Sequence, residues 1–405
     1  MSLDYTIELL RKLVAIPTVN PPGKNYREMA LFLKDELENI GLDVELIEIP
    51  EEYLDKHYPY APRHKGYPRY IVYARYGKGD PVLHFNCHYD VVPPGKGWKS
   101  DPFTLRIEDD KVIGRGTTDM KGGIAALLSA FKKSVEDNML KHPIEAVFVP
   151  DEESGGIGTK YLVEELGFKP KYVLIPEPTS SERLAIGHKG MIRGLIKVIG
   201  KQCHASRPWL GINAFEKACI IVSSALPEIR KELGKTKSKY PFIDEGAAYT
   251  TLSLGGYAIS PVMKDNVVPG EFIFSFDLRV IPETDNKTAY SLIENIFKKH
   301  AETQKVKIII EKLIDIPAAI TPPNSPLLEY VKNIATQILQ IEPIIFVNTG
   351  RYDLVYYRVK GSHAVVYGPG VLGQAHSVNE YNKLSELKKF VKIYTAILEN
   401  MDKLT

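Results

Sequence analysis

Three consecutive acids, Asp151, Glu152 and Glu153, follow the short apolar segment IEAVFVP at residues 144–150. Neighbouring carboxylates repel one another, and burying them costs free energy unless a positive group compensates. Either these side chains point into water or a cation binds beside them. The rest of the sequence has to decide between the two.

Further acids and histidines stand where other apolar segments end. His88 and Asp90 close the segment PVLHFNCHYD, and Asp119 lies in the glycine-rich turn GRGTTDMKGG. Glu177 lies in PEP, and His376 lies in GPGVLGQAHSVNE. Each residue alone is more often structural, as a core histidine, a turn acid or a helix cap. Together they predict a site for divalent cations, because carboxylate and imidazole groups bind such metals.

Strands and helices alternate around these residues. Branched and aromatic runs predict strands, and apolar residues at helical spacing predict helices. The strands are expected at residues 69–77, 81–90, 144–150 and 171–178, and the helices at 27–41 and 121–138. This order predicts an α/β catalytic domain with a mainly parallel central sheet flanked by helices. Ligands of such sheets gather at the carboxyl ends of the strands, where the acids and histidines stand.

The pattern changes after residue 186. Residues 187–313 follow the order β-α-β-β-α-β, which is typical of a small split βαβ domain. Strands and helices of the first kind then return. We therefore predict one catalytic domain made of residues 1–186 and 314–405, with residues 187–313 inserted as a lid or dimerisation domain.

Composition argues against several other classes of protein. The chain has 405 residues, of which 44% are hydrophobic and 25% charged, with a formal net charge of +2. This balance gives no reason to expect a nucleic-acid or membrane partner. No apolar run reaches membrane-spanning length, and the N-terminus lacks a signal-peptide pattern. The cysteines have neither disulfide nor zinc-knuckle spacing, so a cytoplasmic location is expected.

The series of motifs resembles that of one family. HYDVVPPGKGW, GRGTTDMKGG, DEESGGIG, PEPT, ASRPWLGINA, DLRVIPE and GQAHSVNE occur in the order found in the di-zinc amidohydrolases and metallopeptidases. Members include acetylornithine deacetylase, succinyl-diaminopimelate desuccinylase, aminoacylase and glutamate carboxypeptidase. The resemblance covers nearly the whole chain. It implies amide hydrolysis with two divalent ions, zinc being expected and cobalt or manganese being the alternatives.

The resemblance implies a set of metal ligands. Asp119 would bridge both ions, His88 and Glu177 would complete one site, and Glu153 and His376 would complete the other. The peptide bond after the bridging aspartate would be cis.

The resemblance also implies the groups that assist the reaction. Glu152 would be the general base, and Asp90 would orient the ring of His88 through its second nitrogen. Asp151 would then face a backbone or solvent partner. His204 would stabilise the oxyanion from the partner subunit of a homodimer formed through the inserted domain, although a surface histidine is the simpler reading of that residue alone.

A substrate carboxylate would be bound by Arg279, with Asn266 near it in the matched pattern. Arginine forks suit carboxylates, but a salt bridge at a strand end explains Arg279 about equally well.

The segment NTGRYDLVYYRVKG departs from the family. Gly350 and Asp353 match, but Arg351 and Tyr352 replace a pair of small residues. Val355 stands where a carboxylate-binding arginine is expected. Arg351 is a candidate to replace that arginine, and such a shift would change which acid group the protein binds.

One further segment has no assigned role. Residues 48–70, EIPEEYLDKHYPYAPRHKGYPRY, are longer and more aromatic than a strand connection needs. They either cover a pocket or pack on the surface.

Deacylation of N-acyl amino acids, of the acetylornithine deacetylase or succinyl-diaminopimelate desuccinylase type, is the leading hypothesis. A carboxypeptidase or dipeptidase is the alternative. A non-catalytic amino-acid-binding relative is less favoured, because the expected ligands and Glu152 are present. A single-metal or metal-free α/β enzyme has little support, because the chain has no GxSxG elbow and no P-loop.

Overall fold

The computed structural model describes residues 3–404 and divides into two compact units. Unit 2 consists of residues 188–320 and 347–351, and unit 1 contains the other described residues. The predicted inserted domain ended at residue 313, but the unit continues because strand β14 (Lys307–Ile316) pairs with β9 (Gly190–Ile199) as far as Ile316. The short segment 347–351 had been expected in the catalytic domain.

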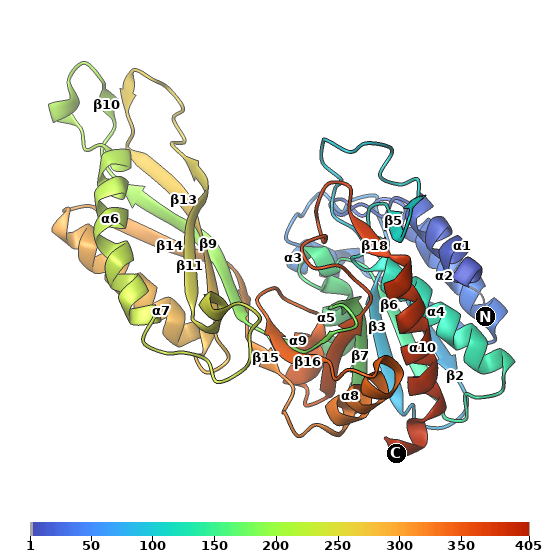
Figure 1. Cartoon of the computed structure of the whole chain (residues 1–405). Helices are drawn as coiled ribbons and strands as arrows, with labels where there is room; N and C mark the ends of the chain where they lie inside the picture. Colours follow the sequence, from blue (N-terminus) through green and yellow to red (C-terminus); the bar gives the residue numbers. More distant parts are fainter. Residues whose placement is uncertain (1–2, 405) are drawn as a thin grey trace. The chain divides into compact units, whose positions relative to one another are not determined.

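Unit 1 is built on a mixed sheet with the strand order β1-β2-β6-β3-β7-β17-β8 (Figure 1). These strands are β1 (Asp43–Ile49), β2 (Arg69–Tyr76), β3 (Leu83–His88), β6 (Ile144–Val149), β7 (Tyr172–Pro178), β8 (Arg183–His188) and β17 (His363–Gly368). The middle strands β6, β3, β7 and β17 are parallel, whereas β1, β2 and β8 pair antiparallel. The predicted α/β fold is confirmed, with the parallel strands confined to the middle of the sheet.

Burial explains this arrangement. Every residue of β3 and β6 is buried, as in parallel strands that helices cover on both faces. The edge strand β1 is largely exposed or half-buried along its length. It therefore lacks the continuous apolar run that marks a central strand.

Helices lie on both faces of this sheet (Figure 1). Helix α4 packs against β3 and β7 and contacts α1, α2 and α10, while α5 and α9 contact strands from the other side. Their bounds are α1 (Leu3–Ala15), α2 (Tyr26–Ile40), α4 (Lys121–Glu136), α5 (Ile157–Glu164), α8 (Pro326–Leu339), α9 (Leu354–Val359) and α10 (Leu384–Glu399). Most of α4 is buried, which explains why its sequence is apolar nearly all round.

Unit 2 follows the order β9, α6, β11, β13, α7, β14. The bounds not yet given are α6 (Ala214–Leu233), β11 (Thr251–Ile259), β13 (Glu271–Val280) and α7 (Asn286–Thr303). The strands form an antiparallel sheet in the order β11-β13-β9-β14. Side chains of α6 and α7 share a core with this sheet, which includes Ile196, Ile221, Phe276 and Ile293.

The α-helix and the strands not yet named are short. They are α3 (Glu51–His57), β4 (Arg106–Glu108), β5 (Lys111–Ile113), β10 (Cys203–His204), β12 (Val267–Val268), β15 (Ala319–Ile320), β16 (Ile344–Asn348) and β18 (Tyr381–Lys383). The single-turn 3-10 helix η1 (Glu152–Ser154) directly follows the buried strand β6. Among the helices of residues 3–404, none combines the length and apolar character needed to cross a membrane.

Candidate metal centre

The predicted ligands come from separate elements of unit 1. His88 is the last residue of β3, Glu177 lies in β7, and Glu153 lies in η1 after β6. Asp119 occupies the turn before α4, and His376 lies in the loop between β17 and β18. The parallel strands β3, β6 and β7 end side by side, so their terminal residues meet at one edge of the sheet.

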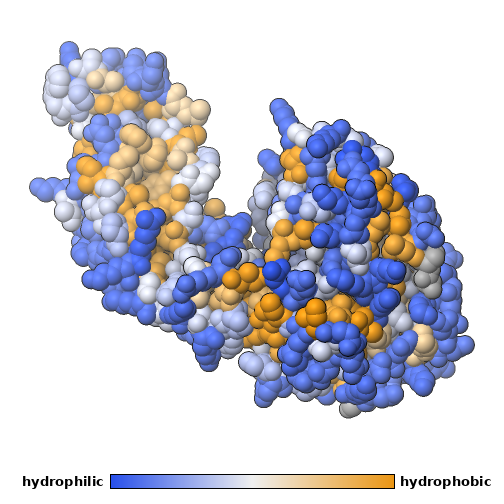
Figure 2. Space-filling view, in the orientation of Figure 1, coloured by the Kyte–Doolittle hydropathy of each residue, from blue (hydrophilic) through white to orange (hydrophobic). Residues whose placement is uncertain are grey.

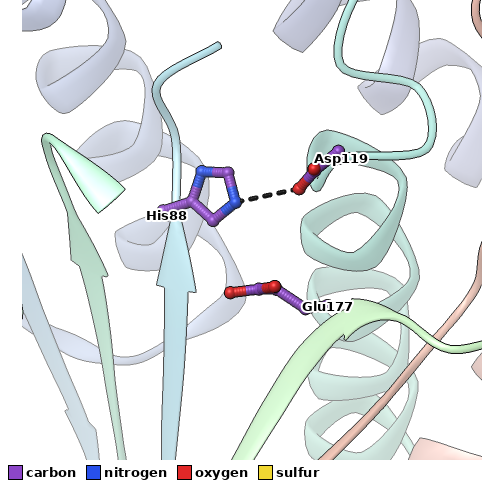
Figure 3. Close-up of side chains that lie close together, drawn as sticks. All are labelled: His88, Asp119 and Glu177. Atoms are coloured by element: carbon purple, nitrogen blue, oxygen red, sulfur yellow. Dashed lines mark hydrogen bonds and ion pairs between the residues drawn. The ribbon is translucent and has the colours of Figure 1, made fainter. Parts of the chain in front are cut away.

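Asp119 belongs to two groups of side chains. Its Oδ1 lies 3.1 Å from Nε2 of His88, and its Oδ2 lies 3.5 Å from Nε2 of His376. Nε2 of His376 also lies 2.8 Å from Oε1 of Glu153. In the group His88, Asp119 and Glu177 (Figure 3), and in the group Asp119, Glu153 and His376, one ligand atom from each residue lies within 4.8 Å of the others. This geometry allows two cations to share one carboxylate.

Glu177 supplies a test of whether a cation fits. Its Oε1 atom is buried and has no hydrogen-bond partner among residues 3–404. A buried acceptor without a donor costs free energy. Burial, followed by the charge of Glu152, raises the pKa of Glu177 well above its ordinary value. A bound cation would remove this penalty, because its charge favours the ionised carboxylate.

The histidines respond to the same carboxylates. Hydrogen bonds to Asp119 and Glu153 raise the pKa of His376 to about 11. Burial opposes protonation of His88, but hydrogen bonds to Asp119 and Asp90 outweigh it and raise its pKa. In the metal-free protein, protonated imidazoles therefore supply the positive charge between the acids. Metal ions of suitable size would replace those protons.

Asp90 connects His88 to the turn that follows β6. Nδ1 of His88 donates to the backbone carbonyl of Asp90 across 3.1 Å, and the Asp90 carboxylate lies farther from it, at 3.5 Å. This leaves Nε2 of His88 as the nitrogen that faces the other ligands. The Asp90 carboxylate accepts from the backbone N–H groups of Glu152, at 3.1 Å, and Glu153, at 3.2 Å. The backbone carbonyl of Asp90, rather than the expected carboxylate, therefore orients the ring, and the carboxylate holds the backbone of Glu152 and Glu153.

Asp151 points away from the ligands. It is fully buried, and its carboxylate accepts from Nε of Arg69 at 2.8 Å and from the hydroxyl of Tyr26 at 2.8 Å. The expectation of a backbone or solvent partner was therefore wrong. Its backbone has a φ of 62°, and Gly155 and Gly156 continue the turn with φ of 100° and 71°. Of the acids in this turn, Asp151 therefore belongs to a buried ion pair, and Glu153 belongs to the candidate cation site.

The sequence interpretation missed Glu380. This buried acid accepts from the backbone N–H groups of Thr118 and Asp119 through Oε1, at 2.8 and 3.0 Å. Its Oε2 accepts from Nη1 of Arg115 at 2.6 Å. The peptide bond between Asp119 and Met120 is cis, as the resemblance implied. The only sequence signal for Glu380 is its place in the same motif as His376, GQAHSVNE.

The remaining predicted site residues belong to unit 2. His204 lies in β10, where its Nδ1 accepts from the backbone N–H and pairs with the hydroxyl of Ser206. Asn266 is exposed beside β12, and Gly350 and Arg351 lie in the segment 347–351. Their roles stay predictions.

The guanidinium of Arg279 donates three hydrogen bonds, one of them from Nη1 to the backbone carbonyl of Thr349 across 3.3 Å. Nε and Nη2 donate to the two carboxylate oxygens of Asp277, at 2.6 and 3.1 Å, and Arg193 pairs with the same carboxylate at 2.8 Å. This is the salt bridge that the sequence left open as an alternative. Val355 lies in α9 and is buried, so this position presents no cation.

Comparison with known proteins identifies the family. Residues 84–400 match Peptidase family M20/M25/M40. The chain belongs to this family. It is therefore a metallohydrolase, and the family expected from the motifs is confirmed.

Relatives match over almost the full length of the chain. An uncharacterized metallohydrolase of Methanococcus maripaludis is 30% identical, over 98% of this chain and 99% of the relative. A succinyl-diaminopimelate desuccinylase of Nautilia profundicola is 28% identical, over 97% of this chain and 98% of the relative.

Two solved structures share the fold. A metallo-carboxypeptidase of Sulfolobus solfataricus superposes with a TM-score of 0.76 at 22% identity, covering 98% of this chain and 99% of the other. A tripeptidase of Staphylococcus aureus has a TM-score of 0.77 at 22% identity, covering 99% of both chains.

Proposed function

We propose that this M20 protein hydrolyses an amide bond of a small amino-acid derivative, using two divalent ions that share Asp119. One observation carries the proposal. Asp119 faces two histidine-carboxylate groups, and one of them contains a buried Glu177 oxygen to which no described residue donates a hydrogen bond. Zinc suits this mixed set of imidazole and carboxylate ligands, and cobalt or manganese are alternatives.

The residues of unit 1 divide the work of hydrolysis. His88, Asp119 and Glu177 would hold one ion, and Asp119, Glu153 and His376 the other. When bound, such ions lower the pKa of water and polarise a carbonyl group. A side chain of the protein must then transfer one proton from the attacking water to the leaving nitrogen.

Glu152 is the group proposed to move that proton. It adjoins Glu153, is only 7% exposed, and has its backbone N–H fixed by Asp90. Glu152 would take a proton from water as the oxygen attacks the carbonyl carbon. The carbon–nitrogen bond then breaks, and Glu152 returns the proton to the leaving nitrogen. The products are a carboxylate and an amine.

The substrate class that we favour is an N-acyl amino acid. Desuccinylases at 27–29% identity and nearly full-length coverage support this choice. A peptide substrate is the second candidate, favoured by the fold shared with a carboxypeptidase and a tripeptidase. For either substrate, we propose that Arg279 and Asn266 bind a carboxylate, assisted by Gly350 and Arg351. Arg279 would have to exchange part of its pairing with Asp277.

We further propose a homodimer formed through unit 2, in which His204 serves the site of the partner subunit. Figure 2 shows apolar surface on this unit. Phe215 and Ile220 on α6, together with Trp209 and Leu210 just before it, are exposed apolar side chains. Sedimentation analysis of the double variant Phe215→Glu/Ile220→Glu should show a monomer where the wild type is a dimer. A cytoplasmic location stays a prediction.

Metal counting combined with a substrate panel tests the function. The panel contains acetylornithine, succinyl-diaminopimelate, other N-acyl amino acids and blocked dipeptides, with the released amine as the readout. Chelator should abolish activity, and zinc or cobalt should restore it. Glu152→Gln should retain both ions and lose at least about 100-fold in turnover. Wild-type turnover in this variant would disprove the assignment of the base.

A further inference from the structure

The aromatic segment at residues 48–70 packs against the turn that carries the predicted general base. Tyr58 and Arg69 of this segment are almost completely buried, at 3% and 0% exposure. Tyr58 belongs to an apolar cluster that also contains Val149, the last residue of β6. The segment therefore does more than cover the surface, because two of its polar groups reach the interior of unit 1.

Arg69 holds the start of the turn through Asp151. Nε of Arg69 lies 2.8 Å from Oδ2 of Asp151, and both side chains are excluded from solvent. The guanidinium lies 4.7 Å from the ring centre of Tyr58 and 5.2 Å from that of Tyr26. A buried ion pair tolerates little displacement, because each charge without the other is strongly destabilising. The position of Asp151 is therefore fixed.

Tyr58 holds the next residues of the turn through a second chain of hydrogen bonds. Its hydroxyl donates to Oδ1 of Asn20 across 2.7 Å, and Nδ2 of Asn20 donates to Oδ2 of Asp90 across 2.9 Å. The Asp90 carboxylate in turn accepts from the backbone N–H groups of Glu152 and Glu153. The ion pair of Arg69 and the hydrogen bonds that start at Tyr58 therefore both end on the turn that carries Glu152 and Glu153.

We propose that Tyr58 and Arg69 are positioning residues for the hydrolytic reaction. Arg69 anchors the turn before Glu152, and Tyr58 fixes Asp90, which holds Glu152 and Glu153 by their backbone. Both act through other residues, Tyr58 through Asn20 and Arg69 through Asp151. The inference rests on the proposed function, since it assigns the two residues to the placement of the base and of one ligand. Small displacements of such groups cost rate, about 100-fold for roughly 1 Å.

Tyr58→Phe is the most direct test. This change removes the hydroxyl that reaches Asn20 and keeps the ring beside Arg69. We expect kcat to fall about tenfold with KM nearly unchanged, since the turn loosens without loss of a substrate contact. In the cobalt-substituted protein, the visible absorption spectrum should shift and the weaker-bound ion should dissociate more readily.

Tyr53→Phe is the matched control. Tyr53 lies in the same segment and the same apolar cluster, but its buried hydroxyl has no hydrogen-bond partner in the part of the chain that the structure describes. This variant should keep the wild-type kcat and cobalt spectrum. Equal effects of the two substitutions would overturn the proposal, because they would show a general response to changes in the segment.

The role of Arg69 is tested with variants that separate its effect on stability from its effect on catalysis. Arg69→Met should lower the melting temperature, because Asp151 then stays buried without its partner. The double variant Arg69→Met/Asp151→Asn removes that charge and should recover much of the melting temperature but not kcat. Recovery of kcat together with stability would show a purely structural role.

The cobalt titration separates this inference from the proposed function. A wild-type chain that binds two cobalt ions but hydrolyses no tested amide would overturn the proposed function. The spectrum of Tyr58→Phe would then still decide whether Tyr58 positions the turn. A wild-type chain that binds no cobalt would overturn both proposals.

Discussion

Glu380 accepts a hydrogen bond from the backbone N–H of Asp119 across 3.0 Å, although the two residues are 261 positions apart in the chain. The same carboxylate accepts from Thr118 and Gly116 and pairs with Arg115. Four donors thus converge on one buried acid. The acid sets the path of the turn that presents the carboxylate shared by both ligand groups.

Replacement of Glu380 by glutamine should therefore weaken metal binding as well as stability. The new amide group would face N–H donors of Gly116 and Arg115, and Arg115 would lose its counter-charge. Breaking a buried pair in this way costs about 3–5 kcal/mol. We expect a lower free energy of unfolding in the metal-free protein, and at least a tenfold weaker affinity for zinc in a competition titration with a chromogenic chelator.

Glu386→Gln provides the control for this prediction. Glu386 is also a buried acid, and it accepts from the backbone N–H and hydroxyl of Ser181 and pairs with Lys389, none of which is a predicted ligand. Its substitution should lower stability and leave zinc affinity unchanged. If both variants bind zinc like the wild type, Glu380 does not position Asp119 for metal binding.

Much of the candidate centre could be predicted because its residues stand at strand ends. His88 and Glu177 lie in buried parallel strands, and η1 follows a third one. Each strand can be recognised from its own local pattern. Because parallel strands end at the same edge of a sheet, the residues at their ends are expected to lie close together. The antiparallel edges of the sheet could not be predicted in this way, since pairing direction depends on the order of strands in space.

The supporting contacts could not be predicted, for a related reason. Tyr58 and Asn20, or Glu380 and Thr118, meet only after the chain has folded, and neither pair has a spacing that a local pattern recognises. Asp151 was misread for the same reason. Its partner Arg69 begins a strand 82 positions earlier and resembles an ordinary exposed arginine in the sequence.

Removing one histidine at a time should separate the two metal positions. His88→Ala and His376→Ala each remove a ligand from one group only, so each variant should retain about one tightly bound ion. Asp119→Asn should weaken both positions. Elemental analysis after gel filtration gives the count. A His300→Ala variant, which changes a histidine of unit 2 paired with Glu228, should keep the wild-type content.

Zinc affinity should rise with pH. In the metal-free protein the pKa of His376 is raised to about 11 by Asp119 and Glu153, against 6.5 for an ordinary histidine. Below pH 6.5 this proton makes its full contribution to the stability of the folded metal-free protein. That contribution is lost as the pH rises toward 11. Because a metal binds only the neutral imidazole, zinc must displace the proton across this range.

Calorimetry in buffers of different ionisation enthalpy measures that displacement. The apparent binding enthalpy at pH 7 should depend on the buffer, which reports protons released to it. His376→Ala should release fewer protons on binding zinc than the wild type. An enthalpy independent of the buffer would contradict the raised pKa.

Gly23→Ala should strongly destabilise unit 1, because the residue lies against the buried Arg69. The φ of Gly23 is 99°, and a Cβ atom there would come within 2.7 Å of Cζ of Arg69. Backbone strain and steric overlap together should lower the free energy of unfolding by about 2–4 kcal/mol.

Gly79→Ala separates the two causes, since Gly79 has a φ of 96° and no described atom within 4 Å of the added Cβ. It should cost about 1–2 kcal/mol from backbone strain alone. Urea unfolding of both variants gives the difference, which measures the contact with Arg69. Equal losses would mean that the guanidinium moves aside freely, and the anchor on Asp151 would then be weaker than its geometry indicates.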